Sequence, residues 1–320
     1  MSKIFTIDLN PTIDEILYVS GNSSSRKNSI IQKSHEIGGK GLNISCALAS
    51  LEMETENFSI ISHLLEGKLT NQYGIHKYIK INPIFHTGEI RKKITILDKL
   101  GLSYKFVEKG VGYNEDLIDE MVLKLENKSK KDDIWVLNGT LGPNLYLNQY
   151  LKFITAAQNL GVKIVFQLNG EDLNYILQHH KPFLIRLNRA ELVEYLNFIY
   201  LKAVDFDDVP TLINYCEKLV KEEKAQQILL TLDKDGVVLF SKHNGIVASS
   251  TNNRLADKYI IDTSFSGEAS LGAFLYAIRN NFNDLDAIKF CCSGGFTTAT
   301  FFGMEFGTFE DILDNQKFLD

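Results

Sequence analysis

Residues 134–166 read IWVLNGTLGPNLYLNQYLKFITAAQNLGVKIVF, and the order of apolar and polar residues in this stretch decides the fold class. The runs Ile134–Leu137 and Lys163–Phe166 have the length and the β-branched or aromatic content of buried strands. Between them, apolar residues at helical spacing form one stripe over Leu145–Leu160. Continuous apolar strands separated by an amphipathic helix are typical of a parallel sheet that is covered on both faces.

The same alternation extends along the chain in both directions. Further strand-like runs are Ile4–Ile7, Phe58–Ile61, Phe183–Ile185, Ile228–Leu232 and Val237–Phe240, and further helix-like segments are Asn43–Leu51, Glu115–Glu126 and Pro210–Lys221. We therefore expect an α/β fold with a doubly wound, mostly parallel sheet flanked by helices. We expect residues 1–320 to form a single domain.

Two segments, residues 12–37 and about 84–106, depart from this pattern. They alternate apolar and polar residues, as in Glu15–Val19 and Lys93–Leu97, and no helical segment accompanies them. Alternation of this kind is typical of antiparallel strands with one solvated face. We expect a small antiparallel sheet that stands off the main domain as a lid.

The composition excludes several classes of protein. The chain has 320 residues, of which 44% are hydrophobic and 23% charged, as in ordinary globular proteins. A net charge of −6 argues against a duplex nucleic-acid binder. The four cysteines have no zinc-ligand spacing, and no apolar stretch is long enough to span a bilayer. The N-terminal residues have no long apolar run, so we expect no signal peptide. We expect a cytoplasmic protein that binds no nucleic acid and no membrane.

A glycine motif, Gly38-Gly39-Lys40-Gly41-Leu42-Asn43, directly precedes a helical segment. Glycines allow a ligand to approach the backbone closely, and the first turn of the helix would offer free N–H groups to an anion. Lys40 adds a positive charge. The alternative is a simple turn between a strand and a helix, and the spacing is not that of a P-loop.

Two further constellations follow predicted strands. Gly267 and Glu268 stand where a second helix begins, so Glu268 is either a residue favoured by the helix dipole or a general base beside backbone amides. Asn188 and Glu191 have the spacing of a helix-capping pair, and at the carboxyl end of a strand they could instead hold Mg²⁺.

Taken in this order, these motifs resemble the ribokinase (PfkB) family of carbohydrate kinases nearly end to end. The chain looks most like the branch that phosphorylates sugar phosphates, 1-phosphofructokinase and tagatose-6-phosphate kinase. Leu9–Asp14 resembles that branch's opening strand, the glycine motif its substrate loop, and Asn188 with Glu191 its N-x-x-E motif.

The resemblance implies ATP and Mg²⁺ as cofactors, a sugar phosphate as substrate and a homodimer paired through the lid. It implies Glu268 as catalytic base, with Gly267 supplying a backbone amide to the transferred phosphoryl group. Substrate residues would be Asp14, Gly38, Gly39, Lys40, Asn43, Lys93 and Asn138. ATP residues would be Arg186, Asn188, Thr231, Asp233, Gly236, Ser266, Gly267 and Ser293, with Asn188 and Glu191 holding Mg²⁺ through water.

The sequence departs from the family at several of these positions. The family signature G-A-G-D is here Phe265-Ser266-Gly267-Glu268, and Lys93 stands where we expect the lid arginine that binds phosphate. Gln167 and Asp233 replace a usual aspartate and a usual glycine. Two alternatives therefore stay open: a catalytically impaired protein that binds ATP or a sugar phosphate as a sensor, and a kinase of an unphosphorylated sugar or nucleoside.

Overall fold

The computed structural model describes residues 2–21, 27–99, 103–139, 141–168, 170–201, 204–205, 207–250 and 259–319. Residues 22–26 and 100–102 of the two expected lid segments lie outside these ranges, as does Thr140 beside Asn138.

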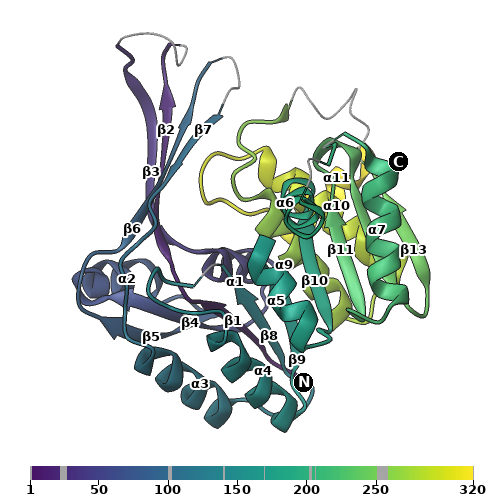
Figure 1. The fold of residues 1–320 in the computed structure, drawn as a ribbon. Helices are drawn as coiled ribbons and strands as arrows, with labels where there is room; N and C mark the ends of the chain where they lie inside the picture. The colour runs from purple at the N-terminus through teal and green to yellow at the C-terminus, as the bar shows by residue number, and fades with distance from the viewer. Residues whose placement is uncertain are drawn as a thin grey trace.

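The described residues form one large sheet and one small sheet (Figure 1). The large sheet has nine strands, in the order β13 (Gly245–Ser249), β12 (Val237–Ser241), β11 (Gln227–Thr231), β10 (Leu184–Asn188), β9 (Lys163–Gln167), β8 (Ile134–Asn138), β1 (Ile4–Asp8), β4 (Thr55–Ser62) and β5 (Ile79–His86). The strands from β11 to β5 run parallel, whereas β12 and β13 are antiparallel to their neighbours. The expectation of a doubly wound, mostly parallel α/β fold is confirmed.

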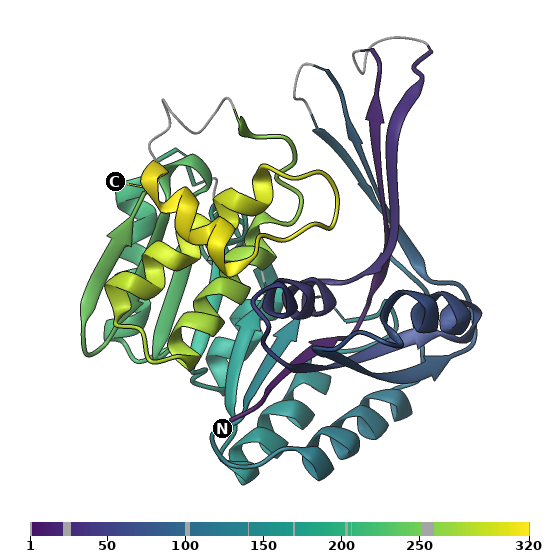
Figure 2. The same ribbon diagram turned by 180° about the vertical axis from the view of Figure 1, so that it is seen from behind.

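Helices cover both faces of the large sheet, and each face has its own apolar core (Figures 1 and 2). One face packs against α3 (Asp116–Lys128), α4 (Gln149–Leu160), α5 (Gly170–His179), α6 (Arg189–Tyr200) and α7 (Val209–Lys221). The other packs against α1 (Lys40–Ser50), α9 (Ser266–Arg279), α10 (Asp284–Ala299) and α11 (Phe309–Asn315). A third, smaller cluster holds α2 (Glu66–Tyr73) against β4, β5 and β3 (Ile30–Gly38). Burial on both sides explains why the strands read as continuous apolar runs.

The small sheet, which we call the lid, has the strand order β3 (Ile30–Gly38), β2 (Thr12–Val19), β6 (Arg91–Leu97) and β7 (Ser103–Val107). It rises from the body of the molecule in both views (Figures 1 and 2). The pairs β2–β3 and β6–β7 are antiparallel, whereas the central pair β2–β6 is parallel. The second lid segment begins at Arg91 rather than near residue 84, because residues 84–86 complete β5 of the large sheet.

The two faces of the lid differ in what they contact. Ile16 and Leu97 are buried against the body, together with Phe265. On the opposite face, the cross-strand neighbours Ile94 and Phe106 lie side by side, and Phe106 is 58% exposed. Because successive side chains along a strand point to opposite faces of a sheet, the lid has one face toward the body and one apolar face toward solvent.

No helix in the described part of the chain combines the length and the apolar character that crossing a bilayer would need.

Candidate active site

The expected site residues gather where the parallel strands end. Asp8 ends β1, and Asn138, Gln167, Asn188 and Thr231 end β8, β9, β10 and β11. In the register of the sheet, Asp8 pairs with Asn138 and Asn138 pairs with Gln167. The carboxyl edge of a parallel sheet is where α/β proteins bind ligands, and these polar ends form the floor of the site.

The glycines of the motif make room for two carboxylates. A Cβ atom on Gly38 would lie 2.6 Å from Oδ2 of Asp14. Cβ atoms on Gly39 and Gly41 would lie 2.7 and 2.8 Å from the carboxylate oxygens of Asp8. These distances are too short for any real side chain, so the glycines are required by contacts inside the protein.

Asp8 occupies the first turn of α1. Its carboxylate accepts hydrogen bonds from the backbone N–H groups of Gly41 and Leu42, both at 2.7 Å, and from Nδ2 of Asn57 at 3.0 Å. Burial raises the pKa of Asp8, and these three donors oppose the shift. The expectation that the first turn of α1 offers free N–H groups to an anion is therefore wrong for Gly41 and Leu42, because Asp8 already uses them.

Two buried side-chain oxygens beside Gly38 have no hydrogen-bond donor among the described residues. Oδ2 of Asp14 and Oδ1 of Asn43 are buried, lie beside Gly38, and accept no hydrogen bond from the described residues. Oδ1 of Asn138 is likewise buried and accepts no hydrogen bond from the described residues. Buried polar atoms are nearly always paired, so these three oxygens are suited to donors that a ligand brings, such as hydroxyl groups.

Two cations from β6 lie beside these acceptors. Lys93 places Nζ 3.6 Å from Oδ2 of Asp14 and 5.3 Å from the centre of the Phe265 ring. Arg91 is paired with Thr12 in the register of the lid, and its Nε is buried without a hydrogen bond. Burial lowers the pKa of Arg91, and the nearby Asp14 and Asp8 carboxylates oppose that shift. Sequence reasoning missed Arg91, although it stands two residues before Lys93 and therefore shares its face of the strand.

A network of charges connects the glycine motif to the opposite half of the sheet. Nζ of Lys40 lies 2.7 Å from Oε1 of Glu191, and Nη1 of Arg186 lies 3.3 Å from Oε2. Nη2 of Arg186 donates to Oγ1 of Thr231 at 2.9 Å. Burial raises the pKa of Glu191, but the charges of Lys40 and Arg186, together with hydrogen bonds from Lys40 and the N–H of Asn188, lower it by more, so the pKa lies below the ordinary value.

Asn188 and Glu191 form a capping box at the start of α6. Oδ1 of Asn188 accepts from the backbone N–H of Glu191 at 2.7 Å, and Oε2 of Glu191 accepts from that of Asn188 at 2.9 Å. The capping interpretation of this pair is confirmed. Among the described residues, no three His, Cys, Asp or Glu side chains are grouped closely enough to hold a metal ion.

The first turn of α9 faces this network. A side chain on Gly267 would overlap Nη2 of Arg186, so the guanidinium lies directly against the turn. Glu268 is half-buried in the same turn, and its side chain has no hydrogen bond or ion pair within the described ranges. Oγ of Ser266 is buried and also lacks a hydrogen bond. A helix N-terminus with an adjacent arginine is suited to an anion.

The remaining ATP candidates are more scattered. Asp233 is exposed and has a φ of +52°, a left-handed conformation that suits the glycine usual at this position. Gly236 is buried against the backbone of Ser249, where a side chain would overlap the carbonyl oxygen. Ser293 is fully buried, and its hydroxyl donates to the carbonyl of Ile312 in α11. In this structure its side chain therefore lines no open space.

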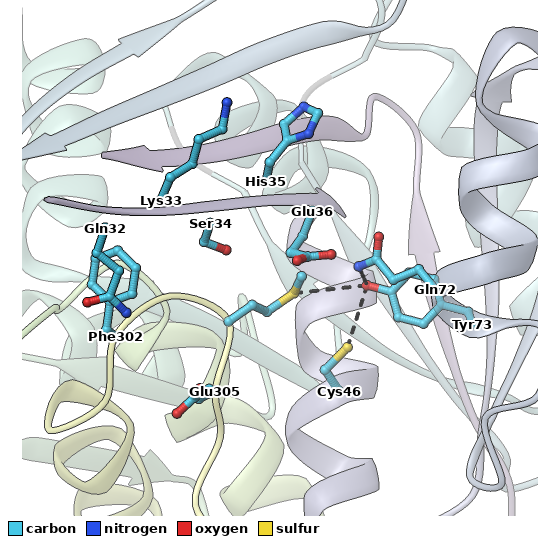
Figure 3. A pocket seen from close by; sticks show the side chains of 11 residues that line it. Gln32, Lys33, Ser34, His35, Glu36, Cys46, Gln72, Tyr73, Phe302 and Glu305 are labelled. Carbon is cyan, nitrogen blue, oxygen red and sulfur yellow. Dashed lines mark hydrogen bonds between the residues drawn. The ribbon is translucent and has the colours of Figure 1, made fainter. Parts of the chain in front are cut away.

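A cavity of about 410 Å³ lies beside the site and contains none of these residues. Strand β3 forms one side and residues 302–305 form another, with Cys46 and Tyr73 between them (Figure 3). Tyr73 donates to the carbonyl of Ile37, next to the glycine motif. Burial raises the pKa of the Cys46 thiol to about 12, so the thiol stays protonated at neutral pH.

A comparison with protein-family models matches residues 2–300 to the pfkB family of carbohydrate kinases. The chain belongs to this family. The expected phosphotransferase class is thereby confirmed, and the family implies ATP as phosphoryl donor, usually with Mg²⁺.

Individual relatives agree with this assignment. A 1-phosphofructokinase of Bacillus subtilis (strain 168) is 23% identical over 312 residues, which cover 97% of this chain and 96% of that protein. Phosphofructokinase-2 from Escherichia coli, solved in complex with substrates and products, has a TM-score of 0.85 at 20% identity over 98% of each chain. Ribokinase from Thermotoga maritima has a TM-score of 0.73 at 18% identity, over 99% of this chain and all of the other. The fold is ribokinase-like, and the resemblance to the 1-phosphofructokinase branch is confirmed.

We predict that Glu191→Gln lowers the free energy of unfolding by about 3 kcal/mol at pH 7, because it removes the charge that Lys40 and Arg186 share. Since the pKa of Glu191 is depressed in the folded state, its stabilisation is present above the unfolded value of about 4.3 and is lost as the pH falls through the folded value. Denaturant unfolding at several pH values measures the difference.

The matched control is Glu120→Gln, which removes one partner of the exposed pair with Lys124. An exposed pair contributes less than about 1 kcal/mol. Equal losses for the two variants, or a difference that does not shrink in acid, would contradict the buried network.

Proposed function

We propose that the chain transfers the terminal phosphoryl group of ATP to a hydroxyl group of a sugar phosphate, of the class of fructose 1-phosphate, fructose 6-phosphate or tagatose 6-phosphate. The observation that carries the proposal is the arrangement around Gly38. Buried oxygens of Asp14 and Asn43 lie beside Gly38 with no hydrogen-bond donor among the described residues, and the ammonium of Lys93 lies 3.6 Å from the Asp14 oxygen. Glu268, at the start of α9, has no hydrogen bond or ion pair in the part of the chain that the structure describes.

The acceptor sugar binds between the lid and the glycine motif. Its hydroxyl groups donate to Oδ2 of Asp14 and Oδ1 of Asn43, which satisfies two buried oxygens. The phosphate that it already carries binds Lys93, with Arg91 as a second cation on the same strand face. The nearby carboxylates of Asp14 and Asp8 form no close hydrogen-bonded ion pair with these cations, so the pocket can favour a phosphorylated acceptor over a neutral sugar.

Transfer takes place at the first turn of α9. Glu268 accepts the proton of the attacking hydroxyl, and the N–H of Gly267 with the guanidinium of Arg186 holds the charge that develops on the phosphoryl oxygens. Lys40 lies nearer to the transferred phosphoryl group than to the phosphate of the sugar, because its ammonium is paired with Glu191.

The residues at the carboxyl end of β10 fit a Mg²⁺ ion that arrives with the nucleotide and is met through water. Direct binding would require Asn188 and Glu191 to give up the capping box and the pair with Lys40. When bound to ATP, Mg²⁺ supplies positive charge to the phosphate oxygens. The lid keeps water from competing as phosphoryl acceptor.

We predict that Glu268→Gln lowers the turnover number at least 100-fold in a coupled ADP-release assay with the three sugar phosphates, because the proton acceptor is removed. Binding of Mg-ATP, measured by calorimetry, should change little. Glu268→Asp keeps the carboxylate and should retain measurable activity.

The matched control is Glu310→Gln, which changes an exposed glutamate in the first turn of α11 and should leave activity unchanged. If the unmodified chain releases no ADP with any sugar phosphate but still binds Mg-ATP, the sensor interpretation replaces the kinase. Equal activity with free sugars would favour the kinase of an unphosphorylated substrate.

We further propose that the solvent-facing side of the lid binds a second copy of the chain. Ile94, Ile96, Tyr104 and Phe106 form two cross-strand pairs on one face, and Tyr104 and Phe106 are 40% and 58% exposed. An apolar sheet face of this kind is typical of a surface that a partner covers. The proposal agrees with the dimer that the family resemblance implies.

We predict that Phe106→Asp converts a dimer to a monomer in light scattering coupled to size-exclusion chromatography, because it places a charge on this apolar face. Leu123→Asp alters an equally exposed leucine on α3 and should leave the dimer intact. A monomeric parent, or dissociation by both variants alike, would contradict the lid interface.

A further inference from the structure

Phe265 lies between the lid and the first turn of α9. It is the residue directly before α9 and is 2% exposed. Its neighbours in the apolar cluster are Ile16 from β2 and Leu97 from β6, which are 2% and 6% exposed. This one cluster therefore joins both central strands of the lid to the residue that precedes the helix carrying Gly267 and Glu268.

The cluster is separate from the cores on the two faces of the large sheet. Tyr18, Phe302, Met304 and Phe306 complete it, and the rings of Phe265 and Phe306 lie 6.2 Å apart in an edge-to-face arrangement. Phe302 and Met304 also line the cavity beside β3 (Figure 3). The apolar contacts thus hold the lid against the catalytic turn without any ligand.

The same ring lies beside Lys93. Nζ of Lys93 lies 5.3 Å from the ring centre, within the range of a cation–π interaction. It lies 3.6 Å from Oδ2 of Asp14, which is longer than a hydrogen bond, and that oxygen stays without a hydrogen-bond donor. The ammonium is therefore shared between a carboxylate and a ring face, and both it and the carboxylate remain available to a ligand.

We propose that Phe265 is the positioning residue that makes this site select phosphorylated acceptors. The inference rests on the proposed sugar-phosphate function. The ring keeps Lys93 from closing onto Asp14, and it fixes the lid strands that carry both side chains. Without the ring, Lys93 and Asp14 neutralise each other, and the preference for an anionic sugar falls.

The test measures binding, so it does not depend on turnover. Calorimetry gives the dissociation constants of fructose 1-phosphate, fructose 6-phosphate and unphosphorylated fructose for the parent, Phe265→Leu and Phe265→Gly. Leucine keeps apolar volume but removes the ring face, so the preference for the phosphorylated sugars should fall roughly 2- to 30-fold, the range of a cation–π interaction. Glycine should lower it further, whereas Mg-ATP should bind as in the parent.

Hydrogen exchange of the ligand-free protein tests whether the Phe265 ring fixes the lid strands. Amides of β2 and β6 should exchange faster in Phe265→Gly and at nearly the parent rate in Phe265→Leu. Phe282→Leu is the matched control, because Phe282 packs against Tyr276 and Phe290 away from the lid. It should change neither the sugar preference nor the exchange of the lid strands.

The binding measurements test the role of Phe265 in selectivity, and the ADP-release assay tests the kinase function. A preference for phosphorylated sugars that is absent in the parent, or unchanged in both Phe265 variants, overturns the inference. Loss of affinity for all three sugars by the same factor also overturns it, because the ring would then be only a structural support. A parent that prefers sugar phosphates but releases no ADP leaves the inference standing and refutes the kinase function.

Discussion

The carboxylate of Glu191 joins the two halves of the large sheet electrostatically. It lies between Lys40, at the start of α1, and Arg186, on β10, and it also closes the capping box of α6. A carboxylate with only 10% of its side chain exposed is costly to bury without such partners. The glycine motif, the start of α6 and the first turn of α9 are consequently held in one arrangement, and the site between them exists before a ligand arrives.

The first turns of α1 and α9 differ in the groups that they leave available to a ligand. The first turn of α1 is filled by the chain's own anion, Asp8, so that region can receive hydroxyl groups but has little to offer a phosphate. The first turn of α9 has Arg186 against it, and its amides donate to no carboxylate of the described residues, although the turn carries Glu268 itself. This difference supports the proposal that phosphoryl groups bind at α9 and at the lid cations, and that the glycine motif binds neutral polar groups.

The large sheet could be predicted from the sequence because each of its strands and helices carries its own periodic signal. The parallel pairing of β2 with β6 could not, because alternation along a strand says nothing of the direction of its neighbour. Asp14, Asn43 and Lys93 were found from motifs, and the structure brings them together.

Other contacts in the site join residues that are far apart in the sequence, so no local sequence pattern predicts them. Lys40 and Glu191 are 151 residues apart in the chain, and Asp8 reaches amides 33 and 34 positions away. The contacts of Ser293, which we expect near the nucleotide, could not be predicted for a different reason. A small polar residue in a helix gives no sign of which way it faces, and here it faces α11.

The contact between Asp8 and the glycine motif also limits which substitutions the motif can accept. Gly41 is excluded from carrying a side chain only by the carboxylate above it, so a shorter residue at position 8 would relax that requirement. Gly39 has in addition a φ of +153°, a conformation that L-residues rarely adopt, so no change at position 8 relieves it. Two glycines that look equivalent in the motif thus differ in kind: one depends on its neighbour and can change together with it, and the other is fixed by the backbone itself.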